Sequence, residues 1–212
     1  MATNLADCSL GIDIGTSSIK VAVIEKGSSR ILLSKTLNHI DDSNVVRDDL
    51  RLNEQNPRVI IGKVEECLRL ISPAILCRVS SVTVCGQMHG LLLWSKTGGG
   101  EKDTETIDLT SKMDEIDFHT NLITWQDKRC DKKFLDTLPK SKIPISTGFG
   151  CPTLFWLQKC KSEVVQVSRC AGSIMDLLVY LVCNFEKVLT SDQIAHSWGY
   201  YDPEHQCWEY AV

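Results

Sequence analysis

Residues 8–20 read CSLGIDIGTSSIK, which is an apolar run, a short turn and the start of a second apolar run. Cys8 to Gly15 has the pattern of a half-buried strand, and Gly15 to Ser18 carries the small residues of a tight turn. Ile19 to Glu25 (IKVAVIE) is rich in β-branched side chains and predicts a second strand. After one more short turn, Arg30 to Leu37 predicts a third strand, which completes an antiparallel meander.

A helix is predicted after the meander and a polar stretch from Asn38 to Asn56. Asn56 suits the N-cap, and Pro57 suits the first helical position, where its missing N–H costs nothing. Apolar side chains then recur at steps of three and four, so one face of the helix packs on the sheet. These positions are Ile60, Val64, Cys67, Leu68, Ile71 and Ile75. Pro73 kinks or ends this helix.

Strand and helix patterns alternate in the rest of the chain. The predicted strands are 79–86, 91–94 and 122–125, and the predicted helices are 153–160 and 176–183. A polar break, Gln87 to Gly90, separates the first two of these strands. Gly98 to Asp117 is rich in acidic residues and predicts a solvated loop or insertion. A meander followed by alternating elements predicts an α/β fold with a mixed sheet and flanking helices.

Composition excludes several classes of protein. Of the 212 residues 43% are apolar and 24% charged, which is typical of a soluble globular protein. The formal net charge of -4 provides no positive field, so we expect neither nucleic acid nor a membrane surface as a partner. The sequence has no run of 18 apolar residues, so we predict no membrane span. The ten cysteines never form a CxxC pair, so we expect no zinc site and mostly buried, reduced thiols in a cytoplasmic protein.

The turn after the first predicted strand has the composition of a phosphate-binding element. Asp13 to Lys20 follows the pattern D-x-G-T-x-x-x-K. Gly15 permits close approach of the backbone, and Thr16 and Ser17 offer hydroxyl and amide donors that converge on phosphate oxygens. Asp13 is placed to hold Mg²⁺, which prefers one or two carboxylates together with phosphates, and Lys20 is the nearest cation. A plain hairpin turn is the alternative.

Several segments together carry a family resemblance. The Asp13 to Lys20 turn resembles the first phosphate element of the superfamily of actin, heat-shock chaperones and sugar kinases. Gly86 to Gly90 (GQMHG), followed by Leu91 to Trp94, resembles the sugar-binding segment of the FGGY carbohydrate kinases that act on ketoses. Further matches are Trp125–Asp127, Arg129–Cys130, Thr147–Gly150, Phe155–Trp156, Ser191–Gln193 and Ser197–Tyr200, similar to the ketoheptose branch of that family. The resemblance implies an actin-like/ribonuclease H-like α/β fold.

The resemblance also implies roles for individual residues. Asp13 is assigned to Mg²⁺, and the nucleotide phosphates are assigned to Gly15, Thr16, Ser17 and Lys20. The sugar is assigned to Gln87, Met88, His89, Gln126 and Asp127, with Arg129 beside them. Some of these segments also have a structural alternative. His89 is otherwise a surface or core histidine, Asp127 and Arg129 form an ion pair, and Asp176 caps a helix. The aromatic residues Phe149, Phe155 and Trp156 are expected in the core.

The activity implied by the resemblance is ATP-dependent phosphorylation of a ketose, with Mg²⁺, from sedoheptulose to sedoheptulose 7-phosphate. A xylulose kinase and a truncated, non-catalytic module that binds nucleotide or sugar are the alternatives. Kinases of this family have two domains, and residues 1–212 match only the first. The chain stops at Val212 in a segment that begins at Trp208 and has no C-cap, so we expect the second domain and its general base to lie beyond it. The chain alone is then expected to be weakly active or inactive.

Overall fold

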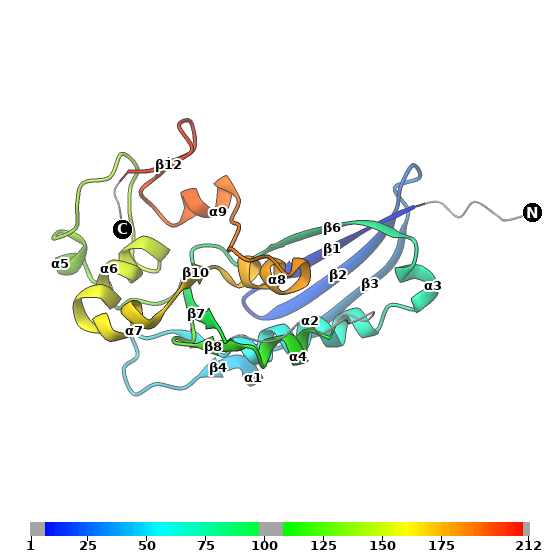
Figure 1. Ribbon diagram of the computed structural model, residues 1–212, viewed down its shortest axis with the longest axis horizontal. Helices are drawn as coiled ribbons and strands as arrows, with labels where there is room; N and C mark the ends of the chain where they lie inside the picture. Colours follow the sequence, from blue (N-terminus) through cyan, green and yellow to red (C-terminus); the bar gives the residue numbers. More distant parts are fainter. Residues whose placement is uncertain (1–6, 98–107, 210–212) are drawn as a thin grey trace, which may run out of the picture.

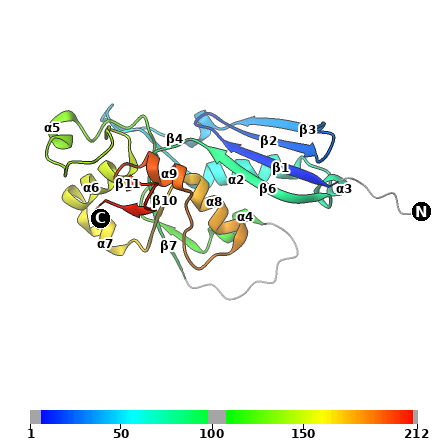
Figure 2. The same ribbon diagram turned by 90° about the horizontal axis from the view of Figure 1, so that it is seen from above.

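A four-stranded mixed sheet forms one end of the molecule. The computed structural model describes residues 7–97 and 108–209. Strands β1 (Cys8–Ile14), β2 (Ser18–Glu25) and β3 (Ile31–Asn38) form the predicted antiparallel meander. Strand β6 (Val79–Gly86) pairs with β1 in parallel, so the order across the sheet is β3-β2-β1-β6 (Figure 2). The prediction of a mixed sheet with a meander at its start is confirmed.

One face of this sheet is covered by helices and forms the main core. Alternate residues of β1 are buried on this face, because successive side chains of a strand point to opposite sides. Helix α2 (Pro57–Arg69) packs against β1, β2 and β3, and helix α8 (Ile174–Cys183) packs against β6. As predicted, the Asn56 side chain caps α2 by accepting from the Arg58 amide. Helix α2 ends before Pro73, which begins the short helix α3 (Pro73–Leu76).

The remaining elements lie mainly beyond the carboxyl end of β1 (Figure 1). One sheet has the order β4-β5-β9, with β4 (Asn44–Val45), β5 (Glu54–Gln55) and β9 (Leu122–Ile123). Another has the order β10-β7-β8, with β10 (Cys170–Gly172), β7 (Leu92–Lys96) and β8 (Ile116–Phe118). Strands β11 (Tyr201–Asp202) and β12 (Cys207–Trp208) form a hairpin. The other helices are α1 (Ile40–Ser43), α4 (Leu109–Met113), α5 (Lys132–Leu135), α6 (Gly150–Cys160), α7 (Ser162–Val167) and α9 (Asp192–Ser197).

Helix α8 begins earlier than the sequence pattern indicates, and Asp176 is not its N-cap. Ser173 is the N-cap, and its side chain accepts from the Asp176 amide at 3.2 Å. The Asp176 carboxylate accepts in return from the Ser173 amide at 2.7 Å and from its hydroxyl at 2.8 Å. These bonds form a capping box, so Asp176 satisfies the helix start from the third helical position.

The predicted acidic loop is only partly a loop. Residues 98–107 lie outside the described residues. Residues 108–117 are not a solvated loop, since they form α4 and the beginning of β8. Leu109, Met113 and Ile116 are buried, which explains why this part folds onto the core despite its acidic neighbours.

Two smaller expectations also need correction. The cysteines are not mostly buried, because only four of the ten are buried and five are exposed, among them Cys85 at the open face of β6. Trp208 does not begin a new element, since it closes the hairpin by pairing with Tyr201. Within the described ranges, no helix is both long enough and apolar enough to cross a membrane.

Candidate functional site

Two predicted site segments meet where β1 and β6 end. Because these strands are parallel neighbours, their carboxyl ends lie at the same edge of the sheet, beside the part of the molecule that holds α6 and α9 (Figure 1). The residues 15–17 that follow β1 are named turn 15–17, and the residues 87–90 that follow β6 are named loop 87–90. The Gln87 amide donates to the Ile14 carbonyl at 2.8 Å. A Cβ on Gly86 would lie 2.9 Å from the Ile14 carbonyl carbon, so glycine permits this approach.

A buried histidine holds the backbone of turn 15–17 through hydrogen bonds. His39 is 1% exposed, and its Nε2 lies 3.0 Å from the Gly15 carbonyl oxygen. A carbonyl oxygen only accepts, so Nε2 carries the proton, and in the neutral ring Nδ1 accepts from the Ser43 hydroxyl at 2.9 Å. The His39 amide also donates to the Ser17 carbonyl at 2.9 Å. The shape of the turn is therefore set by a residue of the polar stretch that follows the meander.

Two further side chains reach Thr16 from other segments. The Gln55 amide group donates to the Thr16 carbonyl at 2.8 Å, and the Trp125 indole donates to the Thr16 hydroxyl oxygen at 3.0 Å. Thr16 keeps its hydroxyl hydrogen for a further acceptor, and the Ser17 side chain is exposed beside it. The turn thus presents polar groups outward on a fixed backbone, which is the arrangement that binding of an anion needs.

Asp13 and Lys20 lie on the open face of the sheet next to the turn. They are cross-strand partners in the β1–β2 ladder, and Lys20 Nζ lies 3.4 Å from Asp13 Oδ2. Both side chains are partly exposed, so this ion pair contributes little to stability and can open. One accessible carboxylate beside a phosphate-type turn fits Mg²⁺, which keeps several waters and takes the rest of its ligands from phosphates. The predicted metal ligand and the predicted phosphate turn are therefore adjacent.

Loop 87–90 is anchored at both of its polar residues. Gln87 is 7% exposed, and its amide group donates to Gln55 Oε1 at 3.0 Å. His89 has a φ of 70°, a left-handed conformation that is uncommon for a residue other than glycine. Its ring stacks on Phe149 with centroids 4.4 Å apart, and Nδ1 faces the Ser197 carbonyl. Since that carbonyl can only accept, Nδ1 carries the hydrogen and donates it, and Nε2 of the neutral ring is left as an acceptor. Met88 is half-buried between them.

Asp127 has a structural environment, while Gln126 beside it is exposed. The Asp127 side chain is 1% exposed and accepts from the Arg129 amide, Nε and Nη2, all within 2.9 Å. It also accepts from the Asn53 amide at 2.8 Å. These four donors are protein groups, so the carboxylate holds its loop in place in the way the ion-pair alternative predicts. Contact of Asp127 or Gln126 with a sugar stays a prediction.

Glu54 continues this ion-pair network on the side of β5 away from the turn. Burial disfavours its charge, but hydrogen bonds from Asn121, Arg47 and Arg129 outweigh burial and lower the pKa of Glu54 to about 2. The paired carboxylates in turn raise the pKa of the buried Arg129 guanidinium against the effect of desolvation. Glu54 and Arg129 are thus charged throughout the neutral range, and their ion pair helps to fix the segment that carries Trp125.

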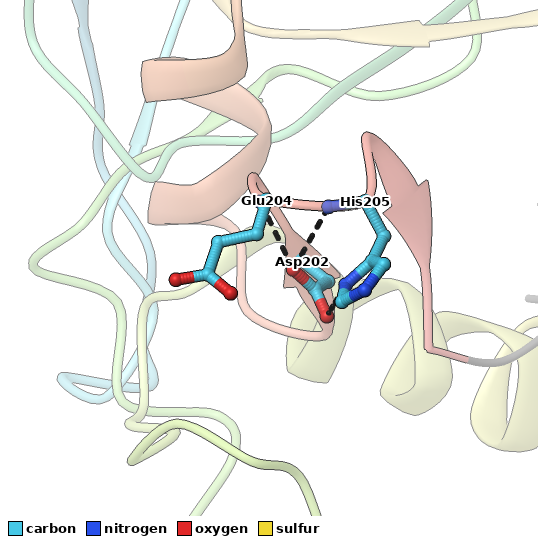
Figure 3. A group of neighbouring side chains, drawn as sticks. All are labelled: Asp202, Glu204 and His205. Atoms are coloured by element: carbon cyan, nitrogen blue, oxygen red, sulfur yellow. Dashed lines mark hydrogen bonds and ion pairs between the residues drawn. The ribbon is translucent and has the colours of Figure 1, made fainter.

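A separate cluster of possible metal ligands lies at the β11–β12 hairpin. Figure 3 shows Asp202 between Glu204 and His205, with the Asp202 carboxylate accepting from His205 Nδ1 at 2.9 Å. The same carboxylate accepts from Lys142 Nζ at 2.8 Å and from the Glu204 and His205 amides. Hydrogen bonds from Lys142 and His205 lower the pKa of Asp202. The Asp202 carboxylate is therefore already hydrogen-bonded by protein groups, and we assign no ligand to this cluster.

The chain is similar in sequence to carbohydrate kinases. The family model described as "FGGY family of carbohydrate kinases, N-terminal domain" matches residues 8–211. A protein of Mus musculus named sedoheptulokinase is 38% identical over 208 residues, which cover 94% of this chain and 43% of that protein. The chain therefore spans less than half the length of this curated relative.

Solved structures of carbohydrate kinases share the fold. A glycerol kinase from Plasmodium falciparum with ADP has a TM-score of 0.71 and 18% identity, covering 96% of this chain and 39% of that chain. A ligand-bound xylulose kinase from Lactobacillus acidophilus has a TM-score of 0.69 and 18% identity, covering 95% of this chain and 38% of that chain. At such identities the likeness shows the fold alone. The predicted actin-like/ribonuclease H-like class is confirmed.

Proposed function

Because the chain belongs to the FGGY family of carbohydrate kinases, we propose that it supplies the phosphate turn and part of the sugar site of an ATP-dependent ketose kinase. The proposed reaction converts sedoheptulose to sedoheptulose 7-phosphate. Residues 8–211 are then the first of two domains, and the general base that accepts the hydroxyl proton belongs to the second. A kinase that uses ATP and a free sugar fits the cytoplasm, where exposed cysteines stay reduced.

The observation that carries this proposal is the meeting of turn 15–17 and loop 87–90 at one edge of the sheet. The hydrogen bond from the Gln87 amide to Ile14 places the two segments one residue beyond adjacent strand ends. Phosphoryl transfer requires the terminal phosphate and the accepting hydroxyl to be held in line and in contact. A nucleotide at the turn and a sugar at the loop would meet this requirement.

The residues near the turn would each have a different role in binding the nucleotide. Asp13 would hold Mg²⁺, directly or through water, and the bound cation would neutralise phosphate charge. The hydroxyls of Ser17 and Thr16 would donate to phosphate oxygens. The Gly15 amide already donates to the Ser18 carbonyl, so Gly15 would contribute by permitting close approach of the phosphate. Lys20 would leave Asp13 when the cation binds and would add a positive charge beside the phosphates.

Loop 87–90 supports a polyol as the second substrate. Gln87 Oε1 and His89 Nε2 are acceptors on a loop whose side chains are fixed by Gln55 and Ser197, and Met88 offers an apolar contact beside them. The name of the 38% identical relative favours a ketoheptose. A xylulose kinase would use the same loop, so the length of the ketose is the finer part of the proposal.

Calorimetry on the purified chain tests the proposal directly. We expect saturable binding of Mg·ATP and of sedoheptulose, with sedoheptulose binding more tightly than xylulose. Asp13→Ala should abolish the Mg²⁺-dependent part of nucleotide binding, whereas Asp114→Ala, which removes an exposed carboxylate that pairs with Arg58, should not. Absence of saturable binding, or equal nucleotide binding by Asp13→Ala, would overturn the assignment.

A coupled assay of ADP release then separates catalysis from binding. If the chain turns over sedoheptulose, Asp13→Ala should lower the rate at least about a hundredfold, as loss of a contact to transition-state charge does. Binding of both ligands without any ADP release would favour the alternative of a non-catalytic binding module for the chain as it stands.

A further inference from the structure

We infer that Gln55 is a positioning residue that fixes the direction of the hydrogen bonds between turn 15–17 and loop 87–90, and thereby presents Gln87 Oε1 as an acceptor for a sugar hydroxyl. The identity of the ligand as a sugar rests on the proposed function. The direction of the hydrogen bonds does not, because it follows from the protein groups alone.

Gln55 is the buried link between the two segments. It is 0% exposed and lies in the two-residue strand β5, directly before the N-cap of α2. Its Nε2 lies 2.8 Å from the Thr16 carbonyl oxygen, and its Oε1 lies 3.0 Å from Gln87 Nε2. One side chain thus contacts the backbone of the turn and the first side chain of the loop.

The Thr16 carbonyl determines which group donates and which accepts in the hydrogen bonds from Thr16 through Gln55 to Gln87. A side-chain amide has one end that donates and one that accepts, while a main-chain carbonyl only accepts. Gln55 must therefore turn its nitrogen to Thr16, and a second acceptor, Asn44 Oδ1 at 3.4 Å, lies on the same nitrogen. The oxygen of Gln55 then faces Gln87, so Gln87 must donate to it. Neither amide can flip without placing two like groups together.

This direction leaves a buried acceptor without a partner at the candidate sugar site. Among the residues that the structure describes, nothing donates to Gln87 Oε1, although the side chain is more than nine-tenths buried. Buried polar atoms are almost always paired, so an unpaired one in a loop next to a substrate site points to a ligand atom or an ordered water. A hydroxyl can donate to this oxygen, whereas a group without a hydrogen on its heteroatom cannot.

The direction of the bonds is tested first without any ligand. Scalar couplings across hydrogen bonds, measured by NMR on the labelled chain, identify which nitrogen donates to which carbonyl. We expect couplings from Gln55 Nε2 to the Thr16 carbonyl carbon and from Gln87 Nε2 to Gln55 Cδ. A coupling from Gln55 Nε2 to Gln87 Cδ would overturn the inference, whatever the chain binds.

Calorimetry with sedoheptulose tests the acceptor role. Gln55→Met frees the Gln87 amide to rotate and should weaken sedoheptulose binding about tenfold. Gln87→Met should have a similar effect, and the double variant should be no weaker, because both changes remove the same acceptor. Asn121→Ala is the matched control, since it removes a hydrogen bond from Glu54, the neighbouring residue of β5. It should leave sedoheptulose binding within twofold of the wild type.

A pH series distinguishes positioning from simple structural support. Gln55→Glu has the same shape but, when ionised, cannot donate to Thr16. As the pH falls its carboxyl regains one donor and one acceptor, so sedoheptulose binding should recover in this variant and not in Gln55→Met. If the wild type binds sedoheptulose and all Gln55 variants bind it with the same affinity, the inference is overturned. If the wild type binds no ketose, the sugar assignment fails with the proposed function, and the couplings alone decide the direction of the bonds.

Discussion

Gly86→Ala should separate the two strands whose ends carry the site. A Cβ at position 86 would lie 2.9 Å from the carbonyl carbon of Ile14, and nearer still to its oxygen. The obstructing atoms belong to the backbone of a paired strand, so no side chain can rotate to make room. Overpacking typically costs about 1–3 kcal/mol, and weakening the bond from Gln87 to Ile14 adds roughly 1 kcal/mol. We expect a loss of about 3 kcal/mol in the free energy of unfolding.

Urea unfolding followed by circular dichroism measures this loss. Gly62→Ala is the matched control, because a Cβ there has nothing within 4 Å and lies in the middle of α2. Replacing a helical glycine by alanine stabilises by roughly 0.5–1 kcal/mol, so the two substitutions should have opposite signs. A stability of Gly86→Ala within about 0.5 kcal/mol of the wild type would refute the claim that the strand ends are in close contact.

Three further changes test the parts that hold the site. The pKa of Glu54 is lowered to about 2, so its charge stabilises the fold above the unfolded value near 4.5 and stops doing so as the pH falls towards 2. The stability difference between wild type and Glu54→Gln should narrow over that range in urea unfolding, and a constant difference would contradict this. Ser173→Ala should lower the free energy of unfolding by about 1 kcal/mol, measured in the same way, and no loss would argue against the capping box. Trp125→Phe removes the bond to Thr16 and should weaken Mg·ADP binding by a factor of about 2–10 in calorimetry, while unchanged affinity would show that the indole does not hold the turn.

Local patterns were sufficient for the meander and for the start of α2. The alternation in β1 and β2 and the Asn56–Pro57 pair report which backbone conformations are favoured, and these are short-range properties. The capping box of α8 was also readable, because Ser173 and Asp176 have the required spacing. The apolar run from residue 176 indicates only the helix body, and the cap lies three residues before it.

Buried polar residues could not be predicted in the same way. His39 and Gln55 stand in a segment whose composition is that of an exposed loop, and their burial depends on strands and turns distant in sequence. For Asp127 the sequence allows an ion pair or a sugar contact, and its hydrogen bonds with Asn53 and Arg129 are visible only in the folded structure. The buried residues that position the site can thus be identified only from the folded structure, whereas several of its exposed residues could be proposed from the sequence.

Paramagnetic broadening by Mn²⁺·ADP tests most directly whether the edge formed by β1 and β6 is the nucleotide site. Mn²⁺ replaces Mg²⁺, and amide resonances close to it are lost from the NMR spectrum of the labelled chain. We predict the strongest broadening at Asp13 and turn 15–17, with weaker broadening at loop 87–90. Broadening centred instead on the hairpin cluster Asp202 to His205, with the amides of turn 15–17 unaffected, would contradict the assignment.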